Sequence, residues 1–239
     1  MAGGYAVQAH GFLQRMSDDV DLFTTQADPA AFDTAVLAVR DAYAADGLTV
    51  EVKKMGQIFA RFLVADEAGR STKVEMGYDW RAEPPTVLEV GPVLHPDDAV
   101  ANKVSTVFTR AEARDYVDVA AALASGRYTG EQLLRLAEER DPGFDRNLFA
   151  QALRAANRWD DEDYMTYGLD APAVTALRAS LRSWADHIEH GSAEANSPAP
   201  VGNSQHTSST GAPDIRKSAS RTTPPPLAPG DKSGHVRRS

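Results

Sequence analysis

The sequence predicts an α+β fold in which a mixed sheet has helices packed on one face and is followed by a helical region. Residues 19–23 alternate charged and apolar side chains, which is typical of a strand. Three further strand-like segments follow one long helix, as in a β-meander. Beyond residue 96 the apolar residues recur only at helical spacing, and this order of elements favours an α+β architecture.

The N-terminal half is predicted to contain two helices and four strands. Asp28 before Pro29 marks a helix start, because Asp is a favoured N-cap and Pro fits the first turn. Asp46 and Gly47 end that helix. Glu67, Ala68 and Gly69 lie in a turn between the last two strands. The expected helices cover residues 5–13 and 29–46, and the expected strands cover residues 19–25, 48–53, 58–65 and 72–78.

The C-terminal half is predicted to be helical after an irregular, proline-rich stretch over residues 80–95. Helices begin at Pro96 and near Ala111, and others cover residues 129–140, 144–157 and 170–190. Thr129 with Gln132 makes a capping box. The last helix is amphipathic, and we expect it to pack on the body of the protein or on a partner.

The chain divides into three predicted parts: a core over residues 1–95, a helical region over residues 96–190 that completes a cleft, and a tail over residues 191–239. About half of the tail is Pro, Ser, Gly or Thr, so it cannot bury enough apolar surface to order itself. We expect a disordered extension that aids solubility or has no function, in preference to one whose basic residues add weak RNA affinity.

Composition excludes several classes of protein. The chain has 239 residues and no cysteine, which rules out a disulfide framework and a thiolate metal site. No apolar run approaches the ~20 residues of a membrane span and no signal peptide is evident, so we expect a cytoplasmic protein. The net charge of the chain is −9. The tail carries six basic and three acidic residues and has a charge of +3, so the rest of the chain has a charge of −12. The acidic body argues against broad nonspecific nucleic-acid binding.

Two aspartates near the N-terminus predict a metal site. Asp19 and Asp21 lie two apart in the expected strand and therefore project from the same face. Like charges held this close repel unless a cation lies between them, and Mg²⁺ (or Mn²⁺) suits a pair of carboxylates completed by phosphate oxygens and water. Gly3 and Gly4 lack Cβ atoms, so their backbone can approach an anion such as a phosphate.

The string GGYAVQAHG…RMSDDVDLF resembles the polymerase-β-like nucleotidyltransferase superfamily, and within it the AbiEii/AbiGii toxin branch that includes the mycobacterial MenT-type toxins. A second block, Lys103…Arg110…Arg114-Asp115-Tyr116-Val117-Asp118, is similar to later motifs of that branch. The resemblance covers residues 3–149. Only Met1 and Ala2 precede the glycines, whereas the family has a further element there, so we expect a late start codon or a truncation that weakens the phosphate cradle.

The resemblance implies a Mg²⁺-dependent transfer of a nucleotidyl group from an NTP to an acceptor hydroxyl, possibly of tRNA. It also implies the toxin of a toxin–antitoxin or phage-defence pair, with an antitoxin as partner. Gly3, Gly4 and Ser17 would bind the nucleotide and Lys103 its β- and γ-phosphates. Asp118 would orient Lys103 or the attacking hydroxyl. The implied metal ligands are Asp19, Asp21 and Glu75, the last from a strand next to the Asp-x-Asp strand.

Several alternatives stay open at this point. Glu75 could be a solvated residue paired with Lys73 or Arg61, and Lys103 an ordinary surface lysine. Asp118 could form an exposed pair with Arg114, one helical turn away, although its helical phase leaves it free to face a cleft.

At the level of the whole protein, the alternative is a non-catalytic module that binds a nucleotide or a partner through a degenerate nucleotidyltransferase fold. A third interpretation is a metal-independent structural protein in which Asp19 and Asp21 are merely solvated. His187, Glu189 and His190 do not share one helix face, which argues against a metal site there.

Overall fold

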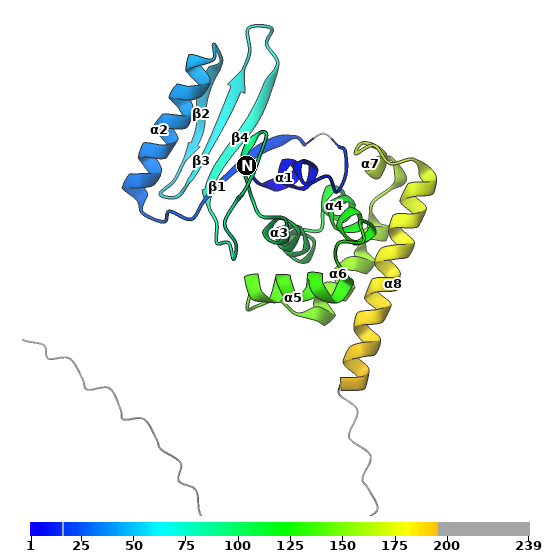
Figure 1. The fold of residues 1–239 in the computed structure, drawn as a ribbon. Helices are drawn as coiled ribbons and strands as arrows, with labels where there is room; N and C mark the ends of the chain where they lie inside the picture. The colour runs from blue at the N-terminus through cyan, green and yellow to red at the C-terminus, as the bar shows by residue number, and fades with distance from the viewer. Residues whose placement is uncertain (16, 196–239) are drawn as a thin grey trace, which may run out of the picture. The chain divides into compact units, whose positions relative to one another are not determined.

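The computed structural model describes residues 1–15 and 17–195 (Figure 1). Its strands are β1 (Asp19–Thr24), β2 (Thr49–Met55), β3 (Phe59–Ala65), β4 (Ser71–Tyr78), β5 (Thr86–Leu88) and β6 (Gly91–Val93). Its helices are α1 (Gly3–Ala9), α2 (Pro29–Ala45), α3 (Pro96–Thr109), α4 (Ala113–Ala124), α5 (Gly130–Arg140), α6 (Arg146–Arg154), α7 (Asp161–Met165) and α8 (Ala171–Ala195). Within these ranges no helix has the length and hydrophobicity of a membrane span.

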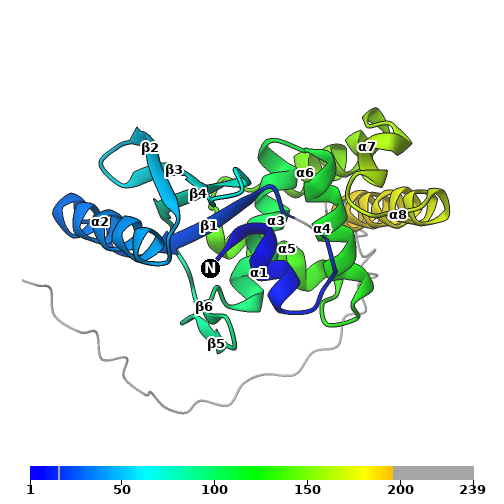
Figure 2. The same ribbon diagram turned by 90° about the horizontal axis from the view of Figure 1, so that it is seen from above.

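The main sheet has the strand order β1-β4-β3-β2, in which β1 runs parallel to β4 and the other pairs are antiparallel. The predicted mixed sheet and meander are therefore confirmed. Alternate residues of β3 and β4 are buried, among them Phe62 and Val74, and they pack against Phe32 and Val36 of α2. Both views show α2 against the sheet on the side away from the other helices (Figures 1 and 2).

The opposite face of the sheet is polar at one end. Strand register places Asp21 of β1 beside Glu75 of β4, and Glu75 beside Arg61 of β3. Two residues earlier on both strands, Asp19 lies beside Lys73 in register. Side chains alternate between the two faces of a strand. Because the apolar residues of these strands face α2, the charged residues between them lie on the opposite face of the sheet.

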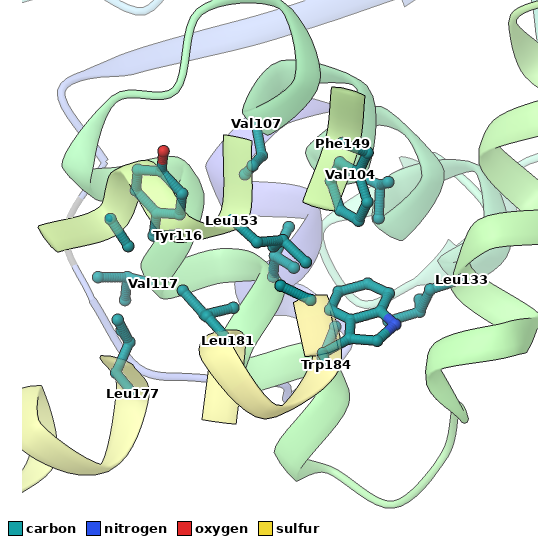
Figure 3. Packing of buried hydrophobic residues seen from close by; sticks show 14 of the residues in the cluster. Val104, Val107, Tyr116, Val117, Leu133, Phe149, Leu153, Leu177, Leu181 and Trp184 are labelled. Atoms are coloured by element: carbon teal, nitrogen blue, oxygen red, sulfur yellow. The ribbon is translucent and has the colours of Figure 1, made fainter. Parts of the chain in front are cut away.

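The helices form a second core of their own (Figure 3). Tyr116 of α4, Phe149 of α6 and Leu181 of α8 are fully buried in it, and Trp184 packs edge-on against Phe149 with ring centroids 5.2 Å apart. The apolar stripe of α8 thus packs on the body of the protein, which is one of the two alternatives that the sequence predicted. The division into a core over residues 1–95 and a helical region over residues 96–190 stays a prediction.

The first residues of the chain connect the two halves. Ala2 donates its backbone N–H to the carbonyl oxygen of Asp21 at 2.8 Å, and Leu94 donates to that of Met1 at 2.9 Å. Ala2 also packs in a small apolar cluster with Ala6 of α1 and Val93 of β6. The main chain just before the glycine pair is therefore fixed beside β1.

Several predictions of element type or bounds are wrong. The helix predicted over residues 5–13 begins at Gly3 and ends at Ala9. Residues 80–95 contain the β5–β6 hairpin instead of an irregular segment, the predicted helix over residues 144–157 ends at Arg154 and continues as a 3₁₀ turn, and α7 was not expected. These elements have three to five residues each, too few to show a periodic pattern. Helix α8 runs to Ala195, past the predicted tail boundary at residue 191, and the tail from residue 196 lies outside the described residues.

Candidate active site

The glycine pair lies in the first turn of α1, directly against β1. Gly3 has a φ of +60°, and a Cβ on it would lie 1.8 Å from Oδ2 of Asp21. A Cβ on Gly4 would lie 2.6 Å from Oγ of Ser17. Both positions therefore need glycine, and the close approach brings the backbone of α1 onto the carboxylate.

The two aspartates of β1 have different surroundings. Nζ of Lys73 lies 2.8 Å from Oδ2 of Asp19. Burial alone would raise the pKa of Asp19, but the bonded ammonium outweighs it and the pKa falls below its ordinary value. Asp21 forms no ion pair with a described side chain, and burial, together with the charge of Asp19, raises its pKa to about 6. The charges of Lys103 and Lys73 lower the pKa of Asp21 but do not offset these two causes.

Glu75 is held by two cations. Arg61 donates to its Oε1 at 2.8 Å, and Nζ of Lys73 lies 3.4 Å from the same oxygen. Both ion pairs that the alternative interpretation of Glu75 predicted, with Lys73 and with Arg61, are therefore present. In the part of the chain that the structure describes, no three His, Cys, Asp or Glu side chains converge closely enough to hold a metal ion. Glu75 as a third ligand stays a prediction.

Asp118 is closed off instead of facing a cleft, so that expectation is wrong. It is fully buried, and Arg15 donates to both of its oxygens at 2.7 Å. Nζ of Lys103 lies 2.8 Å from Oδ2. Burial lowers the pKa of Arg15, but the bonded carboxylate outweighs it and raises the pKa overall.

Lys103 is consequently fixed in place. Only 8% of its side chain is exposed, so the surface-lysine alternative is wrong. Asp118 lies behind it as its anchor. Arg114 does not pair with Asp118; it pairs with Glu112 at 2.9 Å and with Asp18 at 3.3 Å.

The turn between α3 and α4 positions another cation. Ala111 has a φ of +55°, an unusual value for a residue with a side chain. Beyond it, the buried Asp115 of α4 accepts two hydrogen bonds at 2.8 Å from Arg110. This bidentate pair fixes the guanidinium at the end of α3 and raises its pKa.

Two adjoining hollows meet at these residues. A small one of about 70 Å³ is rich in cationic side chains and is lined by Gly4, Arg15, Ser17, Asp19, Asp21, Glu75, Lys103, Arg110 and Arg114. A larger cavity of about 580 Å³ lies between the sheet and α3. Asp21, Glu75, Lys103 and Arg110 line both hollows, and Gly3 lines the larger one.

Seven of the eight predicted site residues therefore line one of these hollows, and the eighth, Asp118, lies behind Lys103. Sequence reasoning missed Arg15, which is 103 residues from Asp118 along the chain and follows no local pattern. It also assigned no role to Arg110 and Arg114, although both stand in the second block of the resemblance.

Comparison with known proteins identifies this architecture. Residues 1–179 match the family described as nucleotidyl transferase AbiEii toxin of type IV toxin–antitoxin systems. Among solved structures, the fold is similar to that of MenT4, a nucleotidyltransferase toxin from Mycobacterium tuberculosis H37Rv. The likeness has a TM-score of 0.54 and 19% sequence identity, and it covers 79% of this chain and 74% of that one. No curated protein sequence matches.

The fold and the family together define the class of protein, a nucleotidyltransferase of the toxin type. The family match extends over well more than half of the chain. The chain belongs to the AbiEii nucleotidyltransferase toxin family.

Proposed function

We propose that the chain transfers a nucleotidyl group from an NTP to an acceptor hydroxyl, with a divalent cation, Mg²⁺ or Mn²⁺, held by Asp19 and Asp21. The observation that carries this proposal is the carboxylate of Asp21, which lines both hollows beside Asp19, forms no ion pair with a described side chain and has a pKa raised to about 6. Two carboxylates with room for phosphate oxygens suit Mg²⁺, which keeps few protein ligands. When bound, the ion would stabilise the attacking and leaving oxygens.

The chain's own residues position the triphosphate. Lys103 and Arg110 line the small hollow together with the carboxylates, and each is fixed by a buried aspartate. Cations held in this way stabilise developing charge without having to reorganise. The hydroxyl of Ser17 and the backbone of Gly4 complete the wall of the hollow. The acceptor oxygen would bond to the α-phosphorus as the bond to the bridging oxygen breaks, releasing pyrophosphate and the hydroxyl proton.

The acceptor, partner and location of this reaction rest on the family. The resemblance supports the 3′ end of tRNA as acceptor and an antitoxin protein as partner, and the family's description names a type IV toxin–antitoxin system. We place the activity in the cytoplasm, where NTPs and tRNA occur together.

A second candidate function is a module that binds nucleotides without transferring them. Lys73 favours it, because its ammonium lies 2.8 Å from Asp19 and 3.4 Å from Glu75, where a metal ion would compete with it. An ammonium in that position neutralises carboxylates but supplies no open coordination site for a phosphate.

Incorporation of radiolabelled NTPs into total tRNA, with and without Mg²⁺, separates the two functions. The proposal predicts label in tRNA that requires the cation and falls by about 10²–10³-fold or more in Asp21→Asn. Asp33→Asn, on the exposed surface of α2, serves as the matched control and should keep full activity. Label that persists in Asp21→Asn would remove that carboxylate from the mechanism. Mg²⁺-dependent NTP binding without incorporation into tRNA, protein or small-molecule acceptors would favour the module.

A further inference from the structure

The floor of the larger cavity has an opening between two aromatic rings. Phe23 of β1 and Phe59 of β3 flank Gly77 of β4 in strand register, and all three line the cavity. A Cβ on Gly77 would meet nothing closer than 3.9 Å, and Gly77 has no positive φ. Packing and backbone geometry therefore do not demand a glycine there, and its missing side chain leaves a flat, apolar-edged space on the sheet.

The wall facing this floor is a polar stripe of α3. Asn102, Ser105, Thr106 and Thr109 recur at helical spacing and line the cavity. The hydroxyls of the two threonines donate to carbonyl oxygens of their own helix. By contrast, Oδ1 of Asn102 and Oγ of Ser105 are buried and bonded to no group in the part of the chain that the structure describes. Buried polar atoms of this kind are rare in folded proteins.

The orientation of the Asn102 amide is fixed by the hydrogen bond that its nitrogen makes. Nδ2 donates to Oδ2 of Asp79 at 3.3 Å, and Arg140 donates to the remaining oxygen of Asp79. A carboxylate needs a donor, so the oxygen of the amide is the atom left over. Asp79 is thus a positioning residue, and the atom of the Asn102 amide that it leaves unbonded is a hydrogen-bond acceptor.

We propose that this cavity holds the base of the NTP, lying flat over Gly77 between the two phenylalanines, and selects a base that carries an exocyclic amino group. The inference rests on the proposed function, because the cavity adjoins the hollow assigned to the triphosphate. The amino group of adenine, cytosine or guanine donates to Oδ1 of Asn102, and Ser105 bonds the neighbouring ring position. Uracil has no amino group, so its carbonyl oxygen would meet the amide oxygen unfavourably.

Calorimetric titration of the full chain with ATP, CTP, GTP and UTP in Mg²⁺ tests the inference independently of catalysis. We expect the best of the first three to bind at least about tenfold tighter than UTP. The preferred nucleotide is then compared with its analogue that has hydrogen in place of the amino group. The analogue is purine riboside triphosphate for ATP, zebularine triphosphate for CTP, or ITP for GTP. Loss of the amino group should weaken binding by about tenfold.

Variants assign this difference to the amide. Asn102→Leu should reduce the effect of the amino group to about twofold, because the acceptor is gone. Thr34→Val, on the exposed surface of α2, removes a hydroxyl that is already bonded within its own helix and should keep the full difference. Should Asn102→Leu fail to fold, Ser105→Ala should still lower the affinity for the preferred nucleotide.

Four outcomes would overturn the inference. UTP binding as tightly as the best of the other nucleotides, or an analogue binding as tightly as its parent, would overturn the base site alone and leave the proposed transferase in place. An undiminished amino-group effect in a folded Asn102→Leu would show that Asn102 is not the acceptor. Absence of binding by every NTP would overturn the proposed function as well.

Discussion

Asp21 and Asp118 are two carboxylates near Lys103 with opposite surroundings. Asp118 is fully buried but bonded on both oxygens by Arg15 and approached by Lys103. Asp21 is less deeply buried, yet no described cation bonds it and Asp19 repels it, so its pKa is raised to about 6. The fold pairs one buried carboxylate with two cations and leaves the other without an ion pair among the described residues.

This difference separates residues that support the site from residues that act in it. A buried charge with its partners in place fixes geometry, and removing one partner leaves the others unpaired. A carboxylate without a partner costs stability and is retained where a function requires it. The comparison predicts that substitutions at the two aspartates change stability in opposite directions.

The largest effect is expected for Asp118→Asn. The amide removes the buried negative charge that Arg15 and Lys103 share, so the free energy of unfolding should fall by about 3–5 kcal/mol. Chemical denaturation followed by circular dichroism measures it. Asp41→Asn, in an exposed pair with Arg40, is the control and should change stability by less than about 0.5 kcal/mol. Equal losses of unfolding free energy in the two variants would mean that the buried ion pairs of Asp118 stabilise the fold no more than an exposed pair does.

Gly3→Ala is expected to have the next largest effect. It places a methyl group on Asp21 and strains the positive φ, so we expect a loss of about 2–3 kcal/mol together with a loss of transfer activity. Gly126→Ala separates the two causes, because Gly126 has a φ of +70° with nothing within 4 Å of the added Cβ. If both variants lose the same stability, the contact with Asp21 is not important and only the backbone strain matters.

The smallest of these effects is expected for Glu75→Gln. If Glu75 is a third ligand, its loss should weaken Mg²⁺ binding by about three- to tenfold, less than the loss of Asp21. Glu51→Gln, in an exposed pair with Lys53 on β2, is the matched control and should leave Mg²⁺ binding unchanged. Unchanged affinity in Glu75→Gln would limit this residue to pairing with Arg61 and Lys73.

The fold was largely predictable because its signals are local. The cap at Asp28, the alternation of charged and apolar residues in β1 and the capping box at Thr129 each lie within a few residues and specify one element. The hairpin β5–β6 and helix α7 were missed because elements of three to five residues carry no period.

The site was predictable only where a motif named its residues. The alternation of β1 places Asp19 and Asp21 on one face, but the pairing of β1 with β4 came from the resemblance. The partners that decide the electrostatics are distant in sequence: Lys73 is 54 residues from Asp19, and Arg15 is 103 residues from Asp118. No spacing rule connects such positions, so the sequence indicated which carboxylates were present but not which were already neutralised.

The central claim, that Asp21 is held unfavourably charged for a divalent cation, makes a signed prediction for pH. Its pKa in the folded chain, about 6, lies above the ordinary 3.8. The stability that this shift contributes is therefore complete below pH 3.8 and is lost as the pH rises through 6. At pH 8 the charge should cost about 1–2 kcal/mol, after allowance for partial exposure to solvent.

The most direct test is the unfolding free energy of wild type and Asp21→Asn at pH 4 and pH 8, in EDTA and in Mg²⁺. In EDTA at pH 8 the variant should be more stable than wild type, and the gap should narrow at pH 4. Mg²⁺ should stabilise wild type by about 2–3 kcal/mol at 100-fold excess over its Kd and should leave the variant unchanged. A variant that is less stable in EDTA at pH 8, or that gains as much from Mg²⁺ as wild type does, would contradict the account.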